Sequence, residues 1–358
     1  MCKADPRRGE RGLVTLEDIA LKAGVSHSTV SRALADSPLV NPSTKERIKN
    51  LAREAGYQVN QVARNLKTRS TKTIGLVVPE ISNPFYPELI QRVADHAKLA
   101  GYSLQLHLSA ADQESESDCI ASLSANRADG VLLVTGERGL VARSQVNALA
   151  ASGTPVVIMG WVEDSDHLDL VAGDDSAGGR ELAKHLADLG HTRIAVLGKA
   201  PHRGAFDRLV GFGDVLRERG IPLLPEMSIE VKNEEDVRLG VTRLVALPDP
   251  PTAIFAYQDS LAAVVYRQLE EAGVSIPNEM TVVGFDDLDL ATYLSPRLTT
   301  VGAHISPLAS AFVSLLVSRI QGTHPEPAPQ SIIVTPKLIV RASSAPPRSR
   351  GVAFGGLS

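Results

Sequence analysis

Short apolar runs alternate with amphipathic segments along most of the chain, from residue 73 onward. Runs such as TIGLVV, DGVLLV and RIAVLG are rich in Val, Ile and Leu and have the length of buried strands. Between them lie stretches such as PELIQRVADHAKLAG and GRELAKHLADLG, in which apolar residues recur at helical spacing. This alternation predicts parallel sheets with helices on both faces. The run holds about twice the strands of an ordinary open sheet, so we predict two similar lobes.

The beginning of the chain has a different pattern, of small polar residues on three short helical segments. Thr15 is placed to cap a helix that ends before Gly24, a residue that readily adopts the positive φ of a tight turn. Ser26 is placed to cap a second helix, and Asn41-Pro42 opens a third over about residues 42 to 55. The apolar residues on the inward face of the first two helices are Leu16, Ile19, Ala20, Ala23, Val25, Val30 and Leu34. Two short helices joined through a glycine and buttressed by a third predict a helix-turn-helix.

The second of these helices would face the major groove of DNA with an outward set of hydrogen-bonding side chains. Arg32 has the planar fork that can read guanine O6 and N7 through two hydrogen bonds. The hydroxyl groups predicted to contact phosphates are those of Thr15, Ser26, Thr29 and Ser31. A plain three-helix bundle with a polar surface is the alternative interpretation.

The distribution of charge favours contact with nucleic acid at this end of the chain. Residues 1–72 contain 14 Lys and Arg against 7 Asp and Glu, whereas the rest contains 23 basic and 34 acidic residues. A basic head on an acidic body suggests that only the head meets a polyanion. A solvated basic surface would give the same count.

Composition indicates a globular protein of the cytoplasm. No apolar run approaches the roughly 18 residues of a membrane span, so we expect no membrane partner. The N-terminal segment lacks the apolar core of a secretory signal. Cys2 and Cys119 are the only cysteines, and Cys2 lies in a polar tail, so a structural disulfide is not expected.

A short helical pattern, NQVARNLK, starts at Asn60 and is followed by a basic linker. Eight residues are too few for a helix that stands alone in water. Together with VTLEDIALKAGVSHSTVSRAL and TIGLVVPEISNPFYPELI, it resembles the LacI/GalR family of bacterial transcription regulators. The resemblance runs from about Val14 to about Ser343.

The resemblance implies roles for particular residues of the head. His27, Ser28 and Arg32 would read bases, and Asn60 would begin a hinge helix that folds on DNA. Leu66 would enter the minor groove as an apolar wedge, at the cost of unstacking a base step; packing of Leu66 against the next domain is the alternative. The chain departs from the family pattern at Val59, where proline is usual before the hinge, and at Ala35, where asparagine is frequent.

The resemblance also implies a body like a periplasmic sugar-binding protein, with two Rossmann-like lobes. The lobes would comprise residues 73–173 with 305–334, and 174–304 with 335–343. An effector would lie between them, at the carboxyl ends of strands. The residues expected to contact it are Asn83, Phe85, Trp161, Arg208, Asp259 and Asp286. Structural roles stay open for three of them: core packing for Phe85, lobe packing for Trp161 and helix capping for Asp259.

The sequence therefore predicts an N-terminal all-α helix-turn-helix head, residues 14–58, a hinge and linker, residues 59–72, and an α/β periplasmic-binding-protein-like body, residues 73–343. Disordered tails are expected at 1–13 and 344–358. The predicted function is that of a transcription regulator, principally a repressor, which binds palindromic double-stranded operator DNA as a homodimer. Its effector would be a sugar or sugar derivative, with a purine or nucleoside as the alternative.

Enzymes and solute-binding proteins are the competing classes. The chain has no G-x-x-x-x-G-K-[ST] loop, no G-x-S-x-G elbow and no metal-ligand spacing of His and Cys, so we expect no catalysis, cofactor or metal. GDDSAGG, residues 173–179, resembles a phosphate loop, but we interpret it as a strand end that turns into a helix. A solute-binding protein would have a signal sequence in place of the head.

Overall fold

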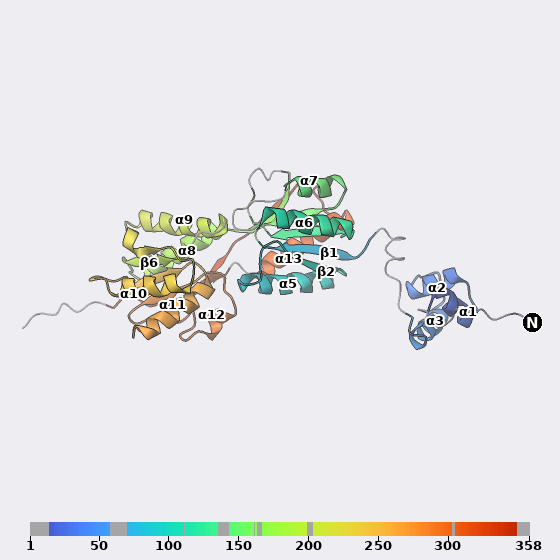
Figure 1. Cartoon of the computed structure of the whole chain (residues 1–358), viewed down its shortest axis with the longest axis horizontal. Helices are drawn as coiled ribbons and strands as arrows, with labels where there is room; N and C mark the ends of the chain where they lie inside the picture. Colours follow the sequence, from blue (N-terminus) through green and yellow to red (C-terminus); the bar gives the residue numbers. More distant parts are fainter. Residues whose placement is uncertain are drawn as a thin grey trace, which may run out of the picture. The chain divides into compact units, whose positions relative to one another are not determined.

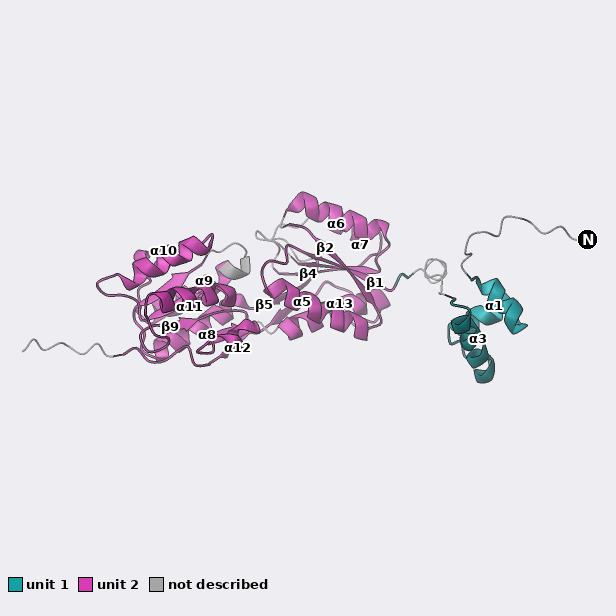
Figure 2. Ribbon diagram, turned by 60° about the horizontal axis from the view of Figure 1, so that its bottom comes forward, with its two compact units in different colours: residues 1–71 teal, residues 72–358 magenta. Residues whose placement is uncertain are grey.

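The computed structural model describes residues 14–57, 70–110, 112–134, 143–160, 162, 167–198, 203–302 and 305–348. The chain forms two compact units, residues 1–71 and 72–358 (Figure 2). Val59, Asn60, Leu66 and Trp161 lie outside the described residues, so the predictions made for them stay predictions.

Within its described residues, 14–57 and 70–71, the first unit contains three helices: α1 (Leu16–Ala23), α2 (His27–Leu34) and α3 (Pro42–Glu54). Thr15 and Asp18 cap α1 reciprocally, and Gly24 ends it with a φ of 65°. The Ser26 side chain accepts from the Thr29 backbone N–H at the start of α2, and Asn41 caps α3 ahead of a proline at its first position. The helix starts predicted from capping residues are confirmed.

The core of the first unit is small and aliphatic. Ile19, Val30, Ala33 and Ile48 are completely buried, and Tyr57 packs against them from the end of the third helix. Because each short helix buries only one face, the three helices depend on one another for stability. The trihelical arrangement predicted for the head is confirmed.

The N-terminal lobe of the second unit, in which Figure 1 labels the strands β1 and β2, contains a six-stranded parallel sheet. The order of its strands is β11-β5-β4-β3-β1-β2. Its strands are β1 (Thr73–Val78), β2 (Ser103–Leu108), β3 (Gly130–Val134), β4 (Val156–Met159), β5 (Asp169–Gly173) and β11 (Ser331–Val334). Its helices are α5 (Phe85–Leu99), α6 (Gln113–Ala125), α7 (Arg143–Ala151) and α13 (Ile305–Gln321).

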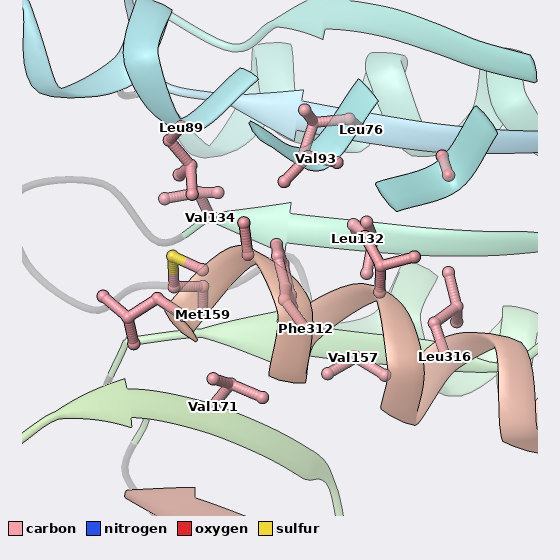
Figure 3. Close-up of a cluster of buried hydrophobic side chains, with 14 of the residues drawn as sticks. Leu76, Leu89, Val93, Leu132, Val134, Val157, Met159, Val171, Phe312 and Leu316 are labelled. Atoms are coloured by element: carbon pink, nitrogen blue, oxygen red, sulfur yellow. The ribbon is translucent and has the colours of Figure 1, made fainter. Parts of the chain in front are cut away.

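The core of this lobe lies between the sheet and the two helices α5 and α13. Phe312 and Leu316 of α13 pack with Leu132 and Val157 of the central strands, and Val93 of α5 joins the same cluster (Figure 3). All five side chains are completely buried. Apolar burial of this kind is the main favourable contribution to the stability of the lobe.

The C-terminal lobe contains a four-stranded parallel sheet in the order β7-β6-β8-β9, and a two-stranded antiparallel ladder of β10 and β12. Its strands are β6 (Ile194–Leu197), β7 (Ser228–Ile229), β8 (Ala253–Ala256), β9 (Thr281–Val283), β10 (Thr300–Gly302) and β12 (Lys337–Ile339). Its helices are α8 (Asp175–Asp188), α9 (Arg203–Glu218), α10 (Glu234–Val245), α11 (Asp259–Glu271) and α12 (Leu290–Tyr293), with the 3-10 turn η1 (Pro225–Met227).

The chain passes between the lobes after β5, after β10 and after β11. Two of these crossovers are side by side, because β5 pairs with β11 and the Asp174 N–H donates to the Val334 carbonyl over 3.0 Å. The predicted two-lobed, doubly wound body is therefore confirmed.

The predicted disordered tail begins too early. Ser344 Oγ lies 2.9 Å from His185 Nε2, and the Ala345 carbonyl accepts a hydrogen bond from His191 Nε2 over 3.0 Å. The Ala345 N–H also donates to Thr281 Oγ1 over 3.1 Å. Residues 344 and 345 thus belong to the C-terminal lobe, because side chains from its neighbouring elements satisfy their polar groups.

Candidate DNA-reading helix and effector site

The outward face of α2 consists of the side chains that the sequence predicted. His27, Ser28 and Arg32 are exposed, and Thr29 and Ser31 are partly exposed. Val30 and Ala33, which alternate with them, are completely buried. The helix is therefore oriented by its apolar residues, and the polar set is left free to meet a surface outside the unit.

Hydroxyl groups cluster at the N-terminal end of α2. Ser26 Oγ lies 2.8 Å from Ser28 Oγ and 2.9 Å from Thr29 Oγ1, and it also accepts from the Thr29 N–H. A helix N-terminus with unpaired N–H groups and hydroxyl donors favours an anion such as a phosphate. Thr15 is less available, because its hydroxyl already donates to Asp18 within the α1 capping box.

Two basic residues of α3, which were not predicted from the sequence, contact the segments before and after α2. Arg47 of α3 donates to the Ala23 carbonyl over 2.9 Å, beside the turn between α1 and α2. Lys49 forms an ion pair of 2.6 Å with Asp36, which follows α2 with a φ of 54°. Helical spacing shows these residues only as polar positions, so nothing in the sequence indicated their partners.

The second candidate site is a cluster of buried charges in the C-terminal lobe. Arg208 of α9 is 7% exposed and Asp286, after β9, is 4% exposed. Arg208 Nε donates to Asp175 Oδ1 over 2.6 Å, and Nη1 donates to the Tyr257 carbonyl over 3.1 Å. Nη2 lies 3.0 Å from Asp286 Oδ1, and the guanidinium stacks on Phe285 with its carbon 3.9 Å from the ring centroid. The structure thus brings the predicted pair Arg208 and Asp286 together.

Glycines explain why α9 lies so close to α8. A Cβ on Gly179 would lie 2.1 Å from the Arg208 carbonyl oxygen, and a Cβ on Gly211 would lie 2.1 Å from the Ser176 carbonyl oxygen. Both distances are far shorter than any tolerated contact, so only glycine permits this crossing. The close approach carries Asp175, at the first position of α8, into contact with Arg208.

Burial changes the proton affinity of both predicted residues. Burial raises the pKa of Asp286 to about 6; Arg208 partly opposes this shift and Asp175 adds to it. Burial lowers the pKa of Arg208, but the carboxylates of Asp286 and Asp175 outweigh it, so the net shift is upward. Arg208 therefore stays charged, and its charge is matched inside the protein.

Asp259 does not have the position that was predicted for it. Its side chain is completely buried; Oδ2 accepts from the Leu288 N–H over 2.9 Å and Oδ1 accepts from the Thr300 hydroxyl over 2.6 Å. It does not cap α11 either, because the cap position belongs to Gln258. The prediction of an effector contact is wrong in this arrangement, since the carboxylate instead fixes the loop that follows Asp286.

Asn83 and Phe85 lie in the other lobe, between the carboxyl end of β1 and the start of α5. Asn83 Oδ1 accepts from the Phe85 N–H over 3.1 Å, which shapes the turn into the helix. Phe85 is partly buried, packs against the N-terminal core and meets Tyr86 edge to face with ring centroids 5.5 Å apart. The core-packing alternative for Phe85 therefore accounts for part of its role.

A pocket of about 400 Å³ lies where the two lobes meet, between α5 and the loop after Asp286. It is lined by Pro84, Pro87, Glu88, Gln91, Arg92, Leu288, Asp289 and Leu290. None of the six residues predicted to contact an effector is among them. Burial, followed by the negative charge of Asp289, raises the pKa of Glu88. The pocket is thus separate from the predicted effector residues, and its lining is mostly apolar with the charged side chains of Glu88, Arg92 and Asp289.

Within the described ranges, no group of three or more His, Cys, Asp and Glu side chains is arranged to hold a metal ion. No helix of those ranges is both long and apolar enough to cross a bilayer.

Comparison with known proteins gives two family matches. Residues 15–60 match the model of bacterial regulatory proteins of the lacI family, and residues 183–344 match a periplasmic binding protein-like domain. The HTH-type transcriptional repressor PurR of Photobacterium profundum is 31% identical over 334 residues, which are 92% of this chain and 98% of the relative.

Two solved structures share the architecture. A transcriptional regulator CelR–cellobiose complex is 28% identical with a TM-score of 0.67, over 92% of this chain and 100% of that chain. The lac repressor dimer bound to operator and the anti-inducer ONPF has a TM-score of 0.81 over 93% of this chain and 100% of that chain; at 23% identity it supports the fold alone. The exposed reading helix, the two-lobed body and the near full-length relative agree, and the chain belongs to the LacI family of DNA-binding transcriptional repressors.

Proposed function

We propose that the protein represses transcription in the cytoplasm as a homodimer on palindromic operator DNA, with one α2 helix in each half-site. The observation that carries the proposal is the exposed row of His27, Ser28 and Arg32 on a helix with a completely buried opposite face. A single α2 helix of 8 residues offers few base contacts, so two copies are needed for specific affinity. The dimeric lac repressor complex is a related assembly.

We further propose that a small polar effector, bound where Arg208 and Asp286 meet, controls operator affinity. Asp286 follows the carboxyl end of β9, the usual ligand position in open α/β sheets, and Arg208 reaches it from α9. Their partner Asp175 is the first residue of α8, two positions after the end of the crossover strand β5, so a ligand that shifts this cluster would act on the junction between the lobes. Coupling of this type is typically worth about 1–3 kcal/mol.

A sugar or sugar derivative is the effector we favour, because a related regulator binds cellobiose. A purine or nucleoside is the second candidate, since a ring N–H can donate to Asp286 as a sugar hydroxyl can. Thermal stabilisation of the purified protein by monosaccharides and disaccharides, against nucleosides and free bases, separates the two. A regulator rather than a catalyst is proposed because the relatives are regulators.

The experiment that tests the proposal is selection of DNA from a random library by the full-length protein. We expect the enriched sequences to converge on a site with two-fold symmetry, with half-sites about one helical turn apart. An asymmetric site, or no enrichment above a variant that lacks residues 1–57, would contradict the proposed dimeric repressor.

A further inference from the structure

The guanidinium of Arg208 has no open side for an anion among its described neighbours. Asp175 Oδ1 lies 2.6 Å from Nε, Asp286 Oδ1 lies 3.0 Å from Nη2, and the Tyr257 carbonyl accepts from Nη1. The flat face of the guanidinium is stacked on Phe285. One positive charge is thus matched by two negative charges, and this three-residue cluster has a net charge of −1 when both carboxyl groups are ionised.

We propose that Asp175 is a specificity-determining residue that keeps Arg208 neutralised, so that the site excludes anionic ligands and accepts an uncharged or cationic molecule with hydroxyl or N–H donors. This inference rests on the proposed effector site at Arg208 and Asp286, and it names the class of ligand that the site takes. Sugar phosphates, sugar acids and nucleotides are excluded by it.

The carboxylate of Asp175 is available to Arg208 because the neighbouring residue, Asp174, caps α8. Asp174 is the N-cap of α8, and its carboxylate accepts from the Ala177 N–H over 2.9 Å. Asp175 occupies the next position and points its carboxylate at Arg208. The crossing of α8 and α9 at Gly179 and Gly211 leaves the two side chains little room to separate.

Asp286 favours a ligand that carries a hydrogen-bond donor. Its Oδ1 is buried and has no aligned hydrogen bond among the described residues, because the contact with Arg208 Nη2 is an ion pair without hydrogen-bond geometry. Asp286 Oδ1 is compensated by the charge of Arg208, and a ligand that brings an O–H or N–H would add an aligned hydrogen bond to it. A phosphate or carboxylate group brings negative charge to the site and would be repelled by both aspartates.

The test uses inorganic phosphate as the probe and compares the full-length protein with Asp175→Asn. Thermal unfolding is followed in sodium phosphate and in sodium chloride of equal ionic strength, and phosphate affinity is then measured by calorimetry. We expect wild type to show no saturable binding of phosphate. Asp175→Asn should bind it at least about tenfold more tightly than wild type, since removal of one carboxylate changes the net charge of the three-residue cluster from −1 to 0 and removes the ionic partner of Arg208 Nε.

Two further variants make the result decisive. Asp188→Asn is the matched control, because Asp188 is a surface aspartate 2.9 Å from Arg219 and its loss should not change phosphate binding. Asp175→Ser keeps a short hydrogen-bond acceptor near Arg208 without the charge, and it replaces Asp175→Asn if that variant does not fold. The proposal is overturned if wild type binds phosphate as well as Asp175→Asn and Asp175→Ser do, or if neither Asp175 variant gains affinity.

Operator binding of the same wild-type preparation is measured in parallel. Failure to bind any operator would refute the proposed regulator and would leave the phosphate result unaffected. Operator binding together with tight phosphate binding by wild type would refute only the assignment of Asp175.

Discussion

At the scale of single residues, the proposed effector site consists of charged side chains that the fold shields from water. Arg208 and Asp286 are both less than a tenth exposed, and burial of an ion pair gains little unless its geometry is good. The pair lies beside Asp175, and the proposed effector site gives these buried charges a role in recognition. Residues of this kind have perturbed pKa values, and such values concentrate at functional sites.

The raised pKa of Asp286 predicts a dependence of stability on pH. Its pKa is about 6 in the folded protein and about 3.8 in the unfolded chain, so the folded state binds this proton more tightly. The contribution of Asp286 to folding therefore becomes less favourable as pH rises from about 4 to about 6, by up to about 3 kcal/mol, and is constant above that range.

We expect Asp286→Asn to remove this dependence. The free energy of unfolding is measured by urea denaturation between pH 4 and 7. Between pH 4 and about 6 it should fall less for Asp286→Asn than for wild type. Asp188→Asn provides the control for the loss of a surface carboxylate. Parallel pH curves for wild type and Asp286→Asn would refute the assigned burial of this group.

The sequence indicated some of these residues and missed others for a physical reason. Arg208 and Asp286 were predicted because they match family motifs, and the structure brings them together as a buried pair. Asp175 was overlooked, because its importance depends on a contact with α9 that is 33 positions away in the chain. Asp259 was misassigned for the converse reason: a polar residue after a strand looks like a ligand contact until the loop that covers it is known.

At the scale of elements, capping and periodicity were sufficient for most of the fold. Capping by Thr15, Ser26 and Asn41 predicted the three helix starts of the head, because these signals are local. Unlike the capping residues, the glycines of GDDSAGG at positions 178 and 179 are not explained by local sequence signals. They lie inside α8, where glycine costs helix stability, and Gly179 is explained by the close crossing with α9. That crossing is a tertiary contact and has no local signature.

The crossing of α8 and α9 predicts different effects on stability when two glycines of α9 are replaced by alanine. Gly211→Ala places a methyl group 2.1 Å from the Ser176 carbonyl, so we expect the protein to lose at least about 2 kcal/mol of stability or to fail to fold. Gly213→Ala meets nothing within 4 Å and should be neutral or stabilising by up to about 1 kcal/mol. Urea denaturation of both variants is the measurement, and equal effects would contradict the described packing of α8 on α9.

At the scale of the whole molecule, the protein combines a small reading unit with a much larger sensing body. The first unit offers three short helices and an exposed polar face, and the second offers two lobes that three crossovers connect. Because β5 and β11 pair alongside each other and β5 leads toward the Arg208 cluster, an effector bound at the proposed site would act on the residues that join the two lobes. Sensing and DNA binding are thus assigned to different parts of one chain, as expected of a LacI-family repressor.

The most direct test of the account is the effect of Arg32→Ala on binding to the operator selected from random DNA. Fluorescence anisotropy should show a loss of about 1–3 kcal/mol on the selected operator, and selection with the variant should show relaxed preference at one symmetry-related pair of positions. Arg53→Ala, which removes an exposed positive charge from α3 instead, is the matched control and should retain the wild-type preference. Equal losses for both variants, with sequence preference unchanged, would contradict the claim that α2 reads the operator.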